Sequence, residues 1–254
     1  VLLNFSSNYI SRVKKSKEIS AEDRLKKAES SSVQGVITES AANIANVVKR
    51  GNRIYTNAMH GLAEHDLELL KKNKKQIVKL SAEVDELSDN VFYFIKNLDE
   101  SSLSASNFYL NILGYLKDMT QSLEYISKVS HKHVNNNHKK LTPTQTKELK
   151  DLDDRFETFF INIINAFRTE SFEEIGIILN RKTELINSVS DKINKQIERT
   201  RADESSPKNT TLYFSLLIET KDLLNATMSI LDEYYSSYDK SAETSPLAKK
   251  NKNT

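Results

Sequence analysis

Apolar residues recur at three- and four-residue intervals through six long stretches of this chain, and this spacing constrains the fold more than any other sequence feature. Such spacing places apolar side chains on one face of an α-helix, which must pack against another helix to bury that face. Turn-forming residues are scarce, with five Gly and three Pro among 254 residues. The many tight turns of an all-β fold are therefore not encoded. We predict an all-α protein.

The apolar stretches and the breaks between them predict six helices, at about residues 33–61, 66–98, 103–138, 143–168, 171–201 and 209–238. Gly61 is well placed to end the first helix, which we expect Gly51 to bend. Asp99–Ser102 offers a cap for the third helix, and Pro143 suits the first turn of the fourth. Ser171–Glu174 has the pattern of a capping box that opens the fifth helix.

The sequence also contains an internal repeat. A shift of 102 positions carries the core of the second predicted helix onto that of the fifth, matching Val84 to Ile186, Leu87 to Val189, Val91 to Ile193 and Ile95 to Ile197. A shift of 101 positions carries the third helix onto the sixth, with Leu116 on Leu217 and Asp118 on Glu219. Amphipathic helices can match by chance. Two adjacent helices that match at nearly one offset, polar positions included, favour a duplicated three-helix unit.

The predicted organisation is a polar, basic flank at residues 1–30, a first three-helix repeat at 31–140, a second at 141–240, and a solvated tail at 241–254. Within the flank, Val1–Phe5 is too short to cross a bilayer, which needs about 20 apolar residues. The basic cluster Arg12–Lys17 follows it. This cluster fits either an ordinary solvated charge run or the cytoplasmic flank of a transmembrane helix.

Composition and motifs exclude several classes of function. The 37 basic and 35 acidic residues give a net charge of +2 with no dominant basic face in the sequence, so a nucleic-acid partner is not expected. The chain has no Cys, which excludes disulfides, thiol nucleophiles and cysteine-ligated metals. It also has no glycine-rich phosphate loop, His-Glu-x-x-His motif or nucleophile elbow. We predict that the protein is not an enzyme.

Histidines and carboxylates are the remaining candidates for metal ligands. His131 and His133 are two residues apart, on different helix faces, so we expect surface histidines. Asp85 and Asp89 lie one turn apart on one face, where like charges repel unless a cation or a basic partner lies between them. The spacing fits a solvated helix edge or a metal site of the kind that helical bundles build from carboxylates. The candidate ligands are Asp85, Asp89, Asp118, Glu124, Asp191, Glu219 and Asp222.

This layout resembles the PhoU family, in which two three-helix bundles each carry an E/D-x-x-x-D element on the second helix. The corresponding elements are Asp85–Asp89 and, in weakened form, Asn187–Asp191. On the third helix, Leu123–Lys128 is similar to the acidic run of the family but has Lys128 in place of the final Asp. The resemblance implies a divalent, iron-type or zinc-type metal on the carboxylates. No other cofactor is expected.

Longer strings resemble the carboxy-terminal cytosolic extension of bacterial PiT-type inorganic phosphate transporters, and a similar extension occurs on sodium–phosphate cotransporters. These strings are Asp23–Asn43, Gln121–His133 and Ser205–Phe214. The resemblance implies a regulatory domain that moderates phosphate uptake through the membrane domain of the same transporter. It also implies that residues 1–17 are the stub of the last transmembrane segment with its basic cytoplasmic flank, through which the domain is tethered to the cytoplasmic side of the bacterial inner membrane.

Two alternative functions are a metal-dependent phosphate sensor and a general coiled-coil adaptor, and the second of these predicts an extended dimer. Self-association into a homo-oligomer is left open by the sequence.

Overall fold

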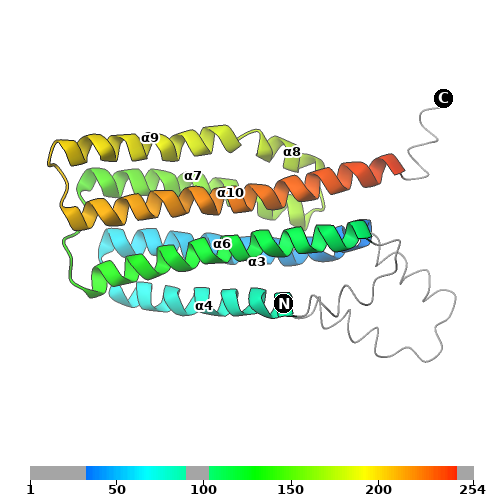
Figure 1. Ribbon diagram of the computed structural model, residues 1–254, viewed down its shortest axis with the longest axis horizontal. Coiled ribbons are helices and arrows are strands. Elements are labelled where there is room, and N and C mark those ends of the chain that lie inside the picture. Colours follow the sequence, from blue (N-terminus) through cyan, green and yellow to red (C-terminus); the bar gives the residue numbers. More distant parts are fainter. Residues whose placement is uncertain (1–32, 90–102, 245–254) are drawn as a thin grey trace.

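The computed structural model describes residues 33–89 and 103–244, which form seven α-helices and no strand. The predicted all-α class is confirmed. The helices are α3 (Val33–Glu64), α4 (Leu67–Asp89), α6 (Leu103–Asn135), α7 (Pro143–Arg168), α8 (Glu173–Leu179), α9 (Lys182–Arg201) and α10 (Pro207–Thr244) (Figure 1). The basic cluster Arg12–Lys17 and the predicted cap at Asp99–Ser102 lie outside the described residues, as do residues 90–98 of the second predicted helix.

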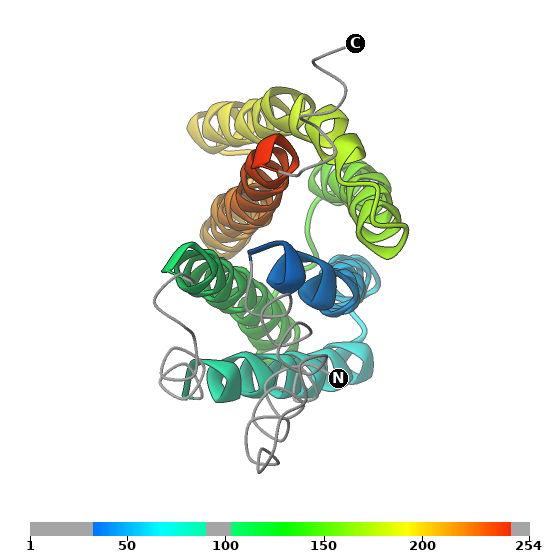
Figure 2. The same ribbon diagram turned by 90° about the vertical axis from the view of Figure 1, so that its right-hand side faces the viewer.

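The helices form two three-helix units that lie side by side. One unit consists of α3, α4 and α6, and the other of α7, the α8–α9 pair and α10. The units meet through their first and third helices, because α3 packs against α7 and α6 packs against α10. The second helices, α4 and α9, lie on opposite outer faces (Figures 1 and 2). The packing inside the two units differs, because α3 packs extensively against α6, whereas α7 makes little direct contact with α10. The duplication itself stays a prediction.

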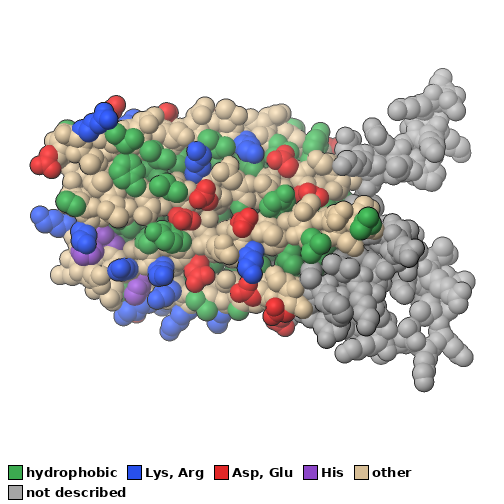
Figure 3. All heavy atoms as spheres, in the orientation of Figure 1, with side chains coloured by type: hydrophobic (Ala, Val, Ile, Leu, Met, Phe, Trp, Pro, Cys, Tyr) green, Lys and Arg blue, Asp and Glu red, His purple; other side chains and the backbone are tan. Residues whose placement is uncertain are grey.

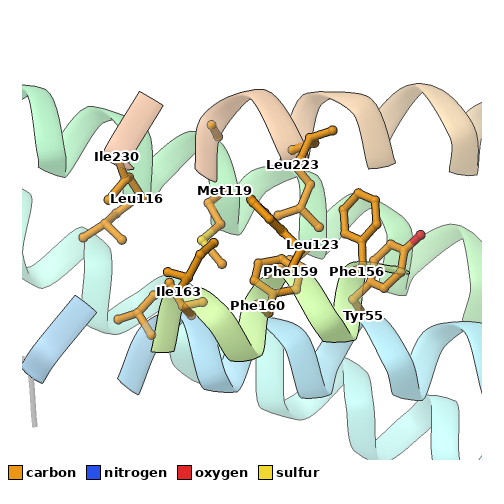
Figure 4. Close-up of a cluster of buried hydrophobic side chains, with 14 of the residues drawn as sticks. Tyr55, Leu116, Met119, Leu123, Phe156, Phe159, Phe160, Ile163, Leu223 and Ile230 are labelled. Atoms are coloured by element: carbon orange, nitrogen blue, oxygen red, sulfur yellow. The ribbon is translucent and has the colours of Figure 1, made fainter. Parts of the chain in front are cut away.

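One continuous hydrophobic core runs through both units. Figure 4 shows its centre, where side chains from α3, α6, α7 and α10 interdigitate. Tyr55 of α3 stacks on Phe156 of α7 with ring centroids 5.1 Å apart, and both side chains are fully buried. Leu116 and Leu123 of α6 face Ile230 and Leu223 of α10 in the same cluster. Burial of these faces against each other holds the two units together.

The structure corrects the role predicted for Gly61 and assigns a packing role to Gly51. Helix α3 is continuous through Gly51, which lies so close to Met119 of α6 that a Cβ atom would overlap the end of that side chain; the bend expected there stays a prediction. Gly61 does not end α3, since the helix continues to Glu64. A Cβ on Gly61 would lie 2.6 Å from Cγ of the buried Leu70, so this glycine allows α4 to approach. The left-handed residue that closes the helix is His65, at φ 60°.

The breaks in the second unit agree with the sequence in part. Helix α7 begins at Pro143 as predicted, and a capping box forms there between Thr142 and Gln145. The capping box predicted at Ser171 is wrong, because the N-cap of α8 is Phe172 and no side chain caps that end. The fifth predicted helix is divided into α8 and α9 around Asn180 and Arg181. None of the described helices combines the length and the hydrophobicity that crossing a bilayer requires.

Candidate functional site

A groove of about 530 Å³ lies between α6 and α10, the third helices of the two units. Both helices contribute polar and apolar groups to its walls, which are formed by Tyr115, Asp118, Gln121, Ser122, Tyr125, Glu219, Asp222, Asn225, Ala226 and Ser229. On each helix these residues lie mostly three or four positions apart, on the flank of the buried stripe that joins the two units. The groove therefore follows directly from the way the third helices pair.

Three carboxylates give the groove its electrostatic character. Asp118 comes from α6, and Glu219 and Asp222 come from α10. Partial burial raises the pKa of Glu219; the nearby charge of Asp222 raises it further, and a hydrogen bond with Ser122 partly offsets this. The groove thus offers acceptor oxygens to a cation or to hydrogen-bond donors. Its negative charge disfavours direct binding of an anion such as phosphate.

The other four predicted ligands lie elsewhere. Asp85 is exposed on α4, and its carboxylate lies 3.4 Å from the ammonium group of Lys117, so a basic side chain from α6 already pairs with it. Asp89, Glu124 and Asp191 are exposed, on α4, α6 and α9 respectively. Because α4 and α9 lie on opposite outer faces, the seven carboxylates do not converge on one centre. Among the described residues, no group of three or more His, Asp or Glu side chains could hold a metal ion. Metal binding stays a prediction.

The expectation that the histidines lie at the surface is wrong for His133. This side chain is only 4% exposed, and its Nε2 lies 2.9 Å from the carbonyl oxygen of Lys139, which can only accept a hydrogen bond. The rings of His65 and His138 flank it, at centroid distances of 6.4 and 5.2 Å. Burial lowers the pKa of His133, and the neighbouring histidines lower it further, so the imidazole is held neutral.

Sequence reasoning missed a buried polar network that joins α7, α9 and α10. Arg199 donates two hydrogen bonds to the Glu148 carboxylate, at 3.0 and 2.8 Å, and Tyr213 donates a third at 2.5 Å. Burial alone would raise the pKa of Glu148, but the hydrogen bonds from Arg199 and Tyr213 outweigh it and the pKa is lowered. The sequence signal that could have indicated the network is that Glu148 directly precedes Leu149, a core residue, and so lies beside the buried face of its helix. Every charged member is paired, so the network holds helices together.

The architecture defines a PhoU-like fold: two three-helix units joined through their first and third helices. A solved structure with this fold is PhoU from Pseudomonas aeruginosa, which matches with a TM-score of 0.67 over 80% of this chain and 96% of that chain. Sequence identity over the match is 7%, so the likeness establishes the fold alone. No family model and no curated protein matches the sequence.

Proposed function

We propose that this chain is a non-catalytic regulatory domain of an inorganic phosphate transporter and that it modulates phosphate uptake by interacting with the membrane domain of that transporter. The observation that carries the proposal is the PhoU-like fold over most of the chain. The strings that resemble the cytosolic extension of PiT-type transporters add support. They connect this fold with one class of membrane protein.

Two of these strings lie at the same end of the bundle. Gln121–His133 forms the carboxy-terminal part of α6, and Ser205–Phe214 forms the start of α10, which packs against α6 (Figure 1). Hydrogen bonds fix this end. Asn209 donates to the carbonyl oxygen of Lys140 at 2.8 Å, and Gln145 donates to Ser205 at 3.3 Å. These two strings therefore fall on one region that carries side chains of both units, whereas the described part of the third string, residues 33–43, begins α3 at the other end of the bundle.

A helical bundle of this kind regulates by differential binding. If it binds one conformation of the membrane domain more tightly than another, it shifts the balance between them, by a factor of ten for each ~1.4 kcal/mol of difference. The proposal needs no reaction on the domain itself. It needs a surface that the continuous core keeps in one shape, and the buried network around Glu148 and Arg199 contributes to that rigidity.

The direct test removes the domain from the full-length transporter. Deleting residues 20–254 should change phosphate uptake and abolish its response to phosphate starvation, with membrane abundance of the protein measured in parallel. A matched control deletes only residues 245–254 and should leave uptake unchanged. Equal uptake with and without residues 20–254, under both replete and starved conditions, would overturn the proposal.

A metal-dependent phosphate sensor is the second candidate. Asp118, Glu219 and Asp222 line one groove, but they do not form a group that could hold a metal ion as they stand, so this candidate requires the three carboxylates to move closer together. A cation there would supply the positive charge that the groove lacks for phosphate. Elemental analysis of the purified protein and thermal shifts with divalent ions plus phosphate test it. The triple variant D118N/E219Q/D222N should abolish such a shift, and the exposed-site control D154N/E198Q/D232N should retain it. No bound metal and no shift would remove this candidate.

The general adaptor reading predicts an extended coiled-coil dimer. The described helices instead fold back on one another around one core, so the shape expected in solution is that of a short, thick bundle. Small-angle scattering distinguishes the two shapes, because an elongated dimer has a much larger radius of gyration than a compact domain of equal mass.

A further inference from the structure

The outer helix α4 is sharply divided by charge. Residues 67–79 contain five lysines and one glutamate, whereas residues 80–89 contain four acidic residues and no basic one. The lysines are Lys71, Lys72, Lys74, Lys75 and Lys79, and all five side chains are exposed. We refer to these five residues as the lysine face. Figure 3 shows the basic side chains along the lower left edge of the molecule, with acidic side chains farther to the right.

The lysine face is largely free of compensating charge. The 2.8 Å contact between Lys71 and Glu68 is the one ion pair that the described part of the chain provides for these five lysines. Their field reaches the neighbouring helix, since the pKa of His131 on α6 is lowered first by burial and then by the charges of Lys74 and Lys71. The surface therefore presents a concentrated positive charge on a protein whose net charge is only +2.

An apolar side chain lies within this positive surface. Val78 is 54% exposed, and it follows Lys74 and Lys75 at the four- and three-residue spacing that places side chains side by side on a helix. Surfaces that combine lysines with an exposed apolar residue are typical of helices that bind at the boundary between water and lipid, where the charges contact head groups and the apolar group enters the boundary.

From the exposure, the charge and the position of Val78, we propose that the lysine face is a docking surface for an anionic lipid bilayer. Helix α4 contains no arginine and no aromatic residue. Proteins often recognise nucleic acids through arginine side chains that bind phosphates with two hydrogen bonds and through aromatic side chains that stack on bases. Helix α4 has neither kind of residue. Lysines act as flexible point charges, which suit a fluid surface of head groups that offers no fixed geometry.

The charge division of α4 also sets the orientation of docking. Lys75 and Glu83 are separated by eight residues, or about 12 Å along the helix. This separation exceeds the distance of about 10 Å over which 0.1 M salt screens a charge. Lys71, Lys72, Lys74 and Lys75 can therefore contact an anionic surface while the acidic half is raised from it, whereas Lys79 lies only four residues, or about 6 Å, from Glu83. Helix α4 lies on the outside of the bundle, and no other helix of the described part of the chain lies beyond it (Figure 2).

This inference is independent of the proposed function, because it concerns binding of the purified chain to lipid and not transport. The test measures co-sedimentation of the protein with vesicles of phosphatidylcholine alone or mixed with phosphatidylglycerol, at low and high salt. Binding is expected only to the mixed vesicles and should weaken as salt rises. Each lysine near an anionic surface contributes about fivefold to binding, so K72Q/K74Q/K75Q/K79Q should bind ~10²-fold more weakly or worse.

The matched control is K147Q/K150Q/K195Q/K208Q, which removes the same charge from exposed lysines of the second unit. It should bind almost as well as the wild type. Gln and Lys have similar helix propensity, and circular dichroism should show both variants folded. Three outcomes would overturn the proposal: no binding to phosphatidylglycerol vesicles at low salt, equal losses in the two quadruple variants, or a duplex oligonucleotide that binds the lysine face more tightly than the vesicles do.

Discussion

The hydroxyl of Thr56 on α3 donates a hydrogen bond of 2.8 Å to Oδ1 of Asp153 on α7. This contact crosses the interface between the two three-helix units, which we call the seam. Asp153 is only 4% exposed, although it carries a carboxylate. Burial raises its pKa, and the hydrogen bond from Thr56 and the nearby His60 partly offset the effect. The seam thus contains a charge that the fold tolerates because it is partnered.

Replacing Asp153 with Asn should stabilise the protein at neutral pH. A carboxyl whose folded pKa is raised binds its proton more readily in the folded state, so the ionised form lowers stability at pH values above that pKa. Asn keeps an acceptor for Thr56 without the charge. Thermal unfolding at pH 7 should therefore show a higher Tm for D153N, and the gain should vanish as pH falls below the ordinary Asp value of 3.8.

Removing the donor instead should have the opposite effect. Thr56→Val keeps the shape of the side chain but leaves the buried carboxylate short of a hydrogen bond, and we expect a loss of about 1–3 kcal/mol in the free energy of unfolding. Urea denaturation at pH 7 measures it. The loss caused by T56V should be smaller when it is measured in the D153N background than in the wild type, and an equal loss in both backgrounds would argue that the contact does not matter.

Arg199→Met should destabilise the protein by about 2–4 kcal/mol, because it leaves the Glu148 carboxylate partly buried without its guanidinium partner. The exposed pair of Arg155 and Asp151 provides the control, and R155M should cost at most about 1 kcal/mol. The folded pKa of Glu148 is lowered, so its contribution is present above the ordinary value of 4.5 and is lost as pH falls. The difference between R199M and wild type in urea denaturation should accordingly shrink in acid.

Two glycine substitutions should change stability in opposite directions. Within the described part of the chain, no atom outside the adjoining turns of α6 lies within 4 Å of where a Cβ on Gly114 would be, so G114A should gain about 0.5–1 kcal/mol from helix propensity. A Cβ on Gly61 would overlap the fully buried Leu70, so G61A should destabilise the protein by about 1–3 kcal/mol. Thermal or urea unfolding of the two variants makes the comparison, and a gain for both would show that α4 can shift away from Gly61 without cost.

The buried His133 should make stability sensitive to mild acid. Its folded pKa is lowered, so the unfolded chain takes up the proton first. The contribution of His133 is complete above the ordinary value of 6.5 and is lost as pH falls from there toward the lowered pKa. In H133Q the side-chain amide replaces the donor to the Lys139 carbonyl, and the fall in Tm below pH 6.5 should be shallower than in the wild type.

Much of the fold was predictable because helical spacing alone determines which residues of a long amphipathic helix are buried. The repeat match of Leu116 with Leu217 falls on two buried residues, and Asp118 and Glu219 both line the groove between α6 and α10. The match is poorer in the second helices, where Val84 is fully buried and Ile186 only partly so. The fifth predicted helix breaks at Asn180 and Arg181, between α8 and α9. Neither position is a glycine or a proline, so the break could not be predicted from helix-breaking residues.

The candidate site was only partly predictable, because spacing along one helix does not specify which residues of other helices come close. Asp85 and Asp89 share one face as expected, yet Lys117 of α6 pairs with Asp85, and only tertiary packing brings that lysine there. The lysine face was also overlooked. The acidic residues of α4 balance its lysines when the net charge is summed over the whole helix. The lysines lie mostly in the first half of the helix and the acidic residues mostly in the second half.

The pairing of α3 with α7 and of α6 with α10 has a consequence for how the protein denatures. Half of the molecule, taken alone, would expose to water the surfaces that now hold Tyr55, Leu116 and Leu123, so neither half forms a complete folding unit. Heat or urea should therefore unfold the whole bundle in a single cooperative step. A destabilising substitution at the interface in one unit should speed the hydrogen exchange of core amides equally in both units.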